Sequence, residues 1–129
     1  MASSDKLSLY KQVDLDARIE GASPHQLILI LFDAAIAALD SAKLAIGDGD
    51  MHRKGESITR VTNILGGLRD SLDVGIESDL PHQLDQLYDY MQRQVFEAHL
   101  INDCQKLDEI QGLLVTVRSG WNGIASAAV

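Results

Sequence analysis

The stretch GASPHQLILILF, residues 21–32, decides the fold of this chain. Ser23 is suited to an N-cap, because its hydroxyl accepts from the unpaired amides of a first helical turn. Pro24 follows at the first helical position, where its fixed φ fits, and Gln26 stands where it closes a capping box. Residues 27–32 are then all apolar, so this helix must bury nearly its whole circumference. Either further helices of the chain surround it, or part of it is left for a partner.

Apolar residues recur at helical spacing in four segments, each with a start or stop signal. We expect the first helix to run from Pro24 to about Ile46. A turn at 47–50 follows, in which Asp50 is placed to cap the second helix. A break at 74–79 separates the second helix from the third, and a junction at 102–103 precedes the fourth. The positions expected to face the core are Ile28, Leu31, Ala35, Leu39, Ala42 and Ile46, then Ile58, Val61, Leu65, Leu68 and Leu72, then Leu84, Leu87, Met91, Val95 and Ala98, and finally Leu107, Ile110, Leu114, Val117, Trp121 and Ile124.

Helices of this length, joined by short turns, predict an all-α fold, an antiparallel up-down-up-down four-helix bundle. The 129 residues are expected to form a single domain, 1–129. Residues 1–20 are expected to be a mobile N-terminal lead-in that contains one short helix packed loosely on the bundle. The tail 125–129 lacks the apolar spacing that would continue the fourth helix.

The charge balance and the cysteine content limit the partners and the compartment. The net charge is −8, and 11 basic residues are dispersed among 19 acidic ones, so neither nucleic acid nor a membrane surface is an expected partner. No segment is typical of a signal peptide or a membrane span. Cys104 is the single cysteine, which excludes an intramolecular disulfide and fits a reducing compartment. We therefore expect a cytoplasmic protein.

No pattern of catalytic or metal-binding residues stands out. Di-metal sites in bundles need inward Glu-x-x-His pairs, and no Glu precedes a His by three residues in this sequence. No cofactor is therefore expected. One signalling alternative stays open, a histidine phosphotransfer bundle that uses His52. In such domains a lysine shares the face of the histidine, whereas Lys54 lies about 200° around the helix from His52.

The pair Gly66-Gly67 lies in the middle of the second expected helix. Each glycine costs a helix interior about 1 kcal/mol relative to alanine. Such a pair indicates a smooth surface that another backbone approaches closely. The approaching backbone belongs either to a bound partner helix or to a neighbouring helix of the bundle, and the sequence does not choose between them.

Several motifs together resemble one protein family, the flagellar secretion chaperones named FliS. These motifs are Tyr10, the run Ala22-Ser23-Pro24-His25-Gln26-Leu27-Ile28, Leu31-Phe32-Asp33, Leu87-Tyr88-Asp89-Tyr90-Met91, Glu97-Ala98, Asn102-Asp103, Trp121 and Ile124. The resemblance extends from about Tyr10 to Ile124. Each motif is modestly specific, and their common order and spacing are the stronger signal.

The resemblance implies a cytoplasmic export chaperone. Members of the family hold the disordered C-terminal segment of flagellin, prevent its premature polymerisation and deliver it to the flagellar type III export gate. The segment folds into helices on the bundle, which is recognition coupled to folding. The export gate protein is thus a second expected partner, and an anti-sigma factor remains an open third one. A bundle that associates with its own copies stays open as an alternative function.

The resemblance also suggests which residues contact flagellin. Tyr10 is expected in a displaceable cover formed by the lead-in. Leu27, Ile30 and Phe32 lie off the core seam and are the first candidates for contact, with plain core packing as the alternative. The remaining partner-binding candidates are Gly66, Gly67 and Tyr88. Tyr88 and Tyr90 point to different faces of one helix, so at most one is expected to be fully buried.

Overall fold

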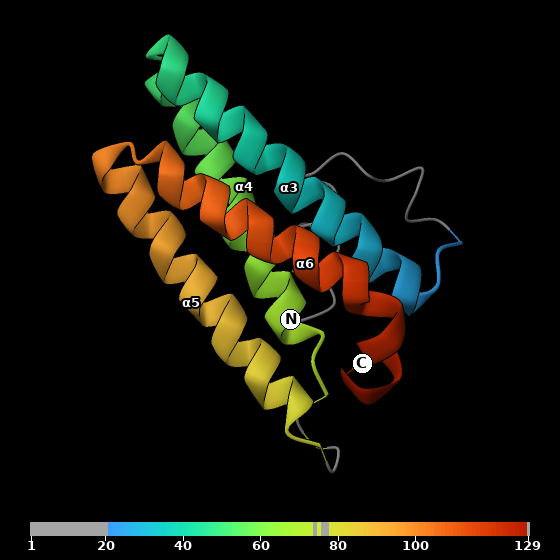
Figure 1. Cartoon of the computed structure of the whole chain (residues 1–129). Coiled ribbons are helices and arrows are strands. Elements are labelled where there is room, and N and C mark those ends of the chain that lie inside the picture. The colour runs from blue at the N-terminus through green and yellow to red at the C-terminus, as the bar shows by residue number, and fades with distance from the viewer. Residues whose placement is uncertain (1–20, 74, 76–77, 129) are drawn as a thin grey trace.

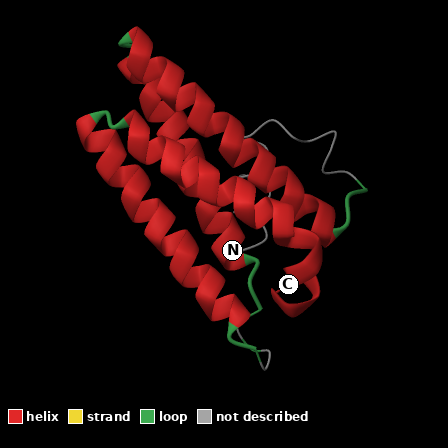
Figure 2. Cartoon of the chain, in the orientation of Figure 1, coloured by secondary structure: helices red, strands yellow, loops and turns green. Residues whose placement is uncertain are grey.

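A computed structural model describes residues 21–73, 75 and 78–128, without the side chains of 122 and 124–128. Tyr10 and the expected lead-in helix therefore lie outside the described residues. Within the described part, four α-helices follow one another and no strand occurs: α3 (Pro24–Asp48), α4 (Met51–Asp70), α5 (Leu80–Ile101) and α6 (Cys104–Ala128) (Figures 1 and 2). The all-α prediction is confirmed.

The helices form a closed ring of neighbours, in which α3 contacts α4, α4 contacts α5, α5 contacts α6 and α6 returns to α3 (Figure 1). Two ion pairs show that α3 and α6 run in opposite directions. Lys43 near the end of α3 reaches Asp108 near the start of α6, and Asp33 near the start of α3 reaches Arg118 near the end of α6. This is the packing of an antiparallel four-helix bundle.

Both predicted signals at the ends of α3 are present. The Ser23 hydroxyl accepts from the Gln26 amide at 3.2 Å, and the Gln26 side chain accepts from the Ser23 amide at 2.9 Å, which completes the capping box. Gly49 ends the helix with φ 70°, a left-handed conformation that glycine adopts without strain. Asp50 then caps α4 by accepting from the Arg53 amide at 3.1 Å.

The run 27–32 is enclosed by the other helices to a large extent. Leu31 and Phe32 are at most 1% exposed, whereas Leu27 and Leu29 remain half-buried. The bundle interior therefore supplies most of the burial that the sequence requires. The largest fully buried side chains are Leu31, Phe32 and Leu39 of α3, Ile64, Leu65 and Leu68 of α4, Tyr88 and Met91 of α5, and Leu107, Ile110, Leu114 and Trp121 of α6.

One helix boundary differs from the prediction. The tail was expected not to continue the last helix, but α6 extends to Ala128. The tail Ala125-Ser126-Ala127-Ala128 is rich in alanine, which has the highest intrinsic helix propensity and needs no amphipathic spacing to propagate a helix that has already begun. The apolar pattern marks where a helix is buried and is a poorer guide to where it ends.

Candidate partner-binding surfaces

Phe32 and Tyr88 belong to the core of the bundle. The Phe32 ring is 0% exposed and meets the Trp121 ring edge-on, with 5.9 Å between the centroids. Tyr88 is 1% exposed, and this burial raises the pKa of its phenol. In the structure of the chain alone, both side chains therefore pack in the core and are not exposed to a partner. Tyr90 is 40% exposed, so the expectation that at most one of the two tyrosines is fully buried is confirmed.

Leu27 and Ile30 lie nearer the surface at the start of α3. Leu27 is half-buried and Ile30 is 8% exposed. Ile30 and Leu29 line an open depression of about 480 Å³, together with Gly21, Ala22, Gln26, Asp33 and Arg118. The guanidinium of Arg118 donates to both carboxylate oxygens of Asp33, at 2.6 and 3.3 Å, and this pair forms the polar edge of the depression.

Gly66 and Gly67 are both half-buried on α4. A Cβ atom built on Gly66 would meet only the Gln92 amide nitrogen, at 3.7 Å, which is ordinary van der Waals contact. Packing within the described bundle therefore does not require glycine at this position. The internal explanation that the sequence left open is not supported for Gly66, and the approach of a partner backbone remains.

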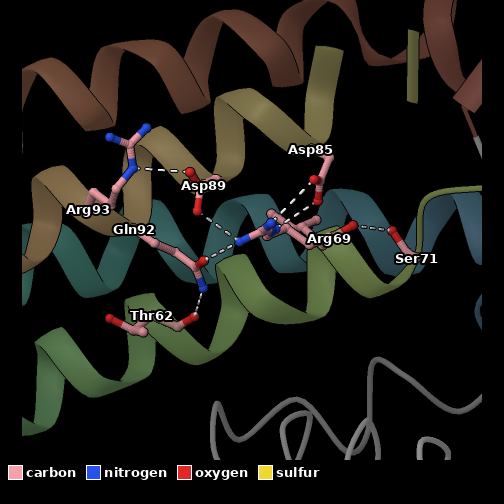
Figure 3. Close-up of polar contacts among 8 residues, drawn as sticks. Thr62, Arg69, Ser71, Asp85, Asp89, Gln92 and Arg93 are labelled. Carbon is pink, nitrogen blue, oxygen red and sulfur yellow. Dashed lines mark hydrogen bonds and ion pairs between the residues drawn. The ribbon is translucent and has the colours of Figure 1, made fainter. Parts of the chain in front are cut away.

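A polar network joins α4 to α5 beside Gly66 (Figure 3). The Arg69 guanidinium donates to Asp85 at 2.8 and 3.3 Å, to Asp89 at 3.2 Å and to Gln92 at 3.0 Å. Hydrogen bonding to Asp85 raises the pKa of Arg69, and the same bond lowers the pKa of the Asp85 carboxyl. The Gln92 amide nitrogen donates in turn to the carbonyl of Thr62 at 3.1 Å. This network fixes the spacing of the two helices.

Sequence reasoning missed this network. Asp85, Asp89 and Gln92 recur at intervals of four and three residues, which places them on one face of α5. That spacing was a usable signal, although it did not identify Arg69 as the common partner on another helix. Three members of the network, Thr62, Asp89 and Gln92, also line an open depression of about 450 Å³, together with Arg93, Phe96 and Glu97.

The surroundings of His52 do not suit phosphotransfer. His52 is exposed in the first turn of α4, and its Nε2 lies 2.9 Å from Glu56, a carboxylate that would repel a phosphoryl group. Lys54 is only 7% exposed, and its ammonium donates to the His99 carbonyl at 3.2 Å and to the Asn102 side chain at 2.6 Å. The cation that would neutralise a phosphoryl group is thus engaged at the end of α5.

Two further properties concern the described residues alone. Over the described ranges, no group of three or more His, Cys, Asp or Glu side chains is arranged to hold a metal ion. None of the helices in these ranges combines the length and the apolar character that crossing a membrane requires.

Large apolar side chains are exposed mostly on α5. In the described part of the chain, four such residues lie on this helix: Tyr90, Phe96, Leu100 and Ile101, with 40, 60, 64 and 66% of their surface exposed. The other helices expose Leu44, Met51 and Val115. Among the described helices, α5 therefore exposes the largest number of large apolar side chains.

Comparison with known proteins agrees with the sequence motifs. The profile of the family described as "Flagellar protein FliS" matches residues 6–128. The chain is 38% identical to the flagellar secretion chaperone FliS of Salmonella typhimurium, over 99% of this chain and 96% of that protein. It is 37% identical to the chaperone FliSB of Pseudomonas aeruginosa, over 97 and 99%, and 31% identical to FliS of Bacillus subtilis, over 94 and 86%. These proteins are chaperones and not enzymes, and the chain described here belongs to the FliS family of flagellar secretion chaperones.

Proposed function

We propose that this chain is a cytoplasmic export chaperone that binds the disordered C-terminal segment of flagellin, prevents its polymerisation and delivers it to the flagellar export gate. The observation that carries the proposal is the family match over residues 6–128. The gate protein is the second partner in this proposal, and an anti-sigma factor is the third. The bundle suits such a role, because its helices enclose a continuous apolar core and it still exposes apolar side chains to a partner helix.

The proposed contact surface has two parts. One part is the depression at the start of α3, which Ile30 helps to line, with Leu27 nearby in the sequence. The other is the α4 surface at Gly66 and Gly67, where the absence of side chains lets a partner helix approach closely. Phe32 and Tyr88 are buried in the core, so in this proposal they support these surfaces without contacting flagellin. We further propose that the lead-in around Tyr10 covers part of the surface until flagellin displaces it.

The function is tested by titrating the full chain with a peptide of about the last 50 residues of flagellin, a length on the order of four helices. We expect a one-to-one complex by calorimetry and gel filtration, with a gain in helical circular dichroism beyond the sum of the two components. A peptide of the same composition in scrambled order is the control. Absence of both heat and a complex with the authentic peptide would contradict the proposal.

Two replacements of Gly66 distinguish an effect on folding stability from an effect on peptide binding. Gly66→Ala is expected to raise the free energy of unfolding by about 0.5–1 kcal/mol, because alanine is the better helix former and its Cβ has room. Gly66→Leu is expected to weaken peptide binding at least tenfold, about 1.4 kcal/mol, because its side chain separates the two backbones. Urea denaturation and calorimetry measure the two effects.

Gly112→Leu on α6 is the matched control for this experiment. Gly112 is exposed, and a Cβ there meets nothing within 4 Å. Its replacement should leave binding unchanged. Equal affinity of Gly66→Leu and the unchanged chain would show that the partner helix does not lie over Gly66.

A further inference from the structure

The C-terminal segment of α6, residues 119–128, buries one of its described side chains. Trp121 is 1% exposed, whereas Gly120 and Gly123 are exposed. The Trp121 ring lies against the His25 ring, with 5.7 Å between the centroids, and its N–H donates to the His25 carbonyl at 3.3 Å. The end of α6 and the start of α3 therefore meet at one end of the bundle (Figure 1).

The backbone of this segment is a weak helix. A Cβ atom on Gly120 or on Gly123 would meet nothing within 4 Å, so packing in the described bundle does not require glycine at either position. Glycine is a poorer helix former than alanine, because its backbone loses more freedom on folding. The Ser119 hydroxyl donates to the Val115 carbonyl at 2.8 Å, and such bonds to the preceding turn bend a helix and slightly destabilise it. We therefore expect the segment to open locally at a lower free energy than the rest of the bundle, with Trp121 as its anchor.

The anchor is placed to transmit such an opening to α3. His25 lies in the first turn of α3, where the amide of Leu27 donates to the Ser23 carbonyl at 2.9 Å. Gln26 of the same turn lines the depression at the start of α3. By its contact with the His25 carbonyl, Trp121 therefore holds backbone that forms part of a proposed contact surface.

We infer that Trp121 is a positioning residue for partner binding, and that the C-terminal segment opens as a unit while the rest of the bundle stays folded. In the closed state the indole fixes the first turn of α3 and, with it, the depression. In the open state that turn loses its contact with α6, and the depression loses its shape. Only the closed state binds a partner helix there, so the apparent affinity falls with the closed fraction. The opening concerns the chain by itself, whereas its effect on affinity rests on the proposed function.

Amide hydrogen exchange of the full chain without peptide tests the opening. The amides of the C-terminal segment and of Leu27 should be protected to a similar degree, at least about a hundredfold less than those in the middle of α5. The double variant Gly120→Ala with Gly123→Ala should raise the protection at both places about tenfold, although Leu27 lies on another helix. Gly112→Ala is the matched control, because it makes the same replacement on α6 outside the segment. It should leave the protection of Leu27 unchanged.

Calorimetry with the flagellin peptide tests the positioning role. Trp121→Phe keeps an aromatic ring and loses the N–H, so it should weaken peptide binding about fivefold by favouring the open state. Adding Gly120→Ala and Gly123→Ala to this variant should recover most of the affinity, because alanine favours the closed, helical state. Adding Gly112→Ala instead should recover none of it. Urea denaturation should show that every variant remains folded.

The two measurements separate the possible failures. Unchanged protection of Leu27 in the double glycine variant overturns the coupled opening. Full affinity of Trp121→Phe, or no recovery with the two alanines, overturns the positioning role. Failure of the unchanged chain to bind the peptide would overturn the proposed function and with it the positioning role, while hydrogen exchange would still decide whether the segment opens.

Discussion

Phe32→Ala is expected to lower the free energy of unfolding by about 3–5 kcal/mol, the usual cost of deleting a buried aromatic ring. The ring is 0% exposed and packs edge-on against Trp121, so its removal leaves a cavity between α3 and α6. Urea denaturation at two wavelengths measures the loss. Phe96→Ala, at a residue 60% exposed, should change the same quantity by no more than about 0.5 kcal/mol.

The same variant tests the role of Phe32 in binding. If the ring only supports the surface, the folded fraction of Phe32→Ala should bind the flagellin peptide with an affinity close to that of the unchanged chain. The measurement is made at low temperature with a stabilising osmolyte, where the variant stays folded. A variant of unchanged stability with lost binding would place the ring in contact with the peptide and contradict its position in the core.

Lys54→Ala is expected to have the second large effect, a loss of about 2 kcal/mol in the free energy of unfolding. The buried ammonium makes two hydrogen bonds at the end of α5, and hydrogen bonds to charged groups contribute about 1.5–3 kcal/mol. Its charge also lies at the negative end of the helix dipole, where a cation is stabilising. Chemical denaturation and hydrogen exchange of the last turn of α5 measure the loss and locate it.

Two control variants separate the contribution of the buried Lys54 charge from that of its apolar stem and from the loss of any exposed cation. Lys54→Met keeps the apolar stem without the charge, so its loss should fall between that of the alanine variant and zero. Arg93→Ala removes an exposed cation from the same helix pair and should cost no more than about 1 kcal/mol. If Lys54→Ala unfolds at the same urea concentration as the unchanged chain, the ammonium does not hold the end of α5.

The bundle was predictable because its signals are local. Ser23, Pro24 and Gln26 define a helix start from four adjacent residues, and Asp50 does the same for α4. Apolar spacing then identified which faces are buried, including Leu65 and Leu114. These features depend on neighbours within one or two helical turns, which a sequence displays directly.

The surface was less predictable because it depends on which helices become neighbours. Phe32 lies off the seam of α3, yet Trp121 of α6 covers it, and that contact joins residues far apart in the sequence. Lys54 is buried against the end of α5, where its ammonium meets acceptors about 45 residues away in the sequence, and no local pattern indicates this contact. The Arg69 network likewise has its acceptors on another helix. Only residues that such contacts leave exposed can bind a partner, so these residues cannot be identified before the helix contacts are known.

The contact between Trp121 and the start of α3 has a consequence for synthesis. The indole N–H donates to the His25 carbonyl at 3.3 Å, and the two residues are 96 positions apart in the sequence. The bond therefore joins the first turn of α3 to the C-terminal part of α6. Contacts of such sequence separation form late, because the intervening chain must first be brought together. While the ribosome still holds the last turns of α6, the base of α3 lacks its cover. A chain synthesised only as far as the middle of α6 therefore exposes the apolar side chains at the start of α3 that Trp121 covers in the complete bundle.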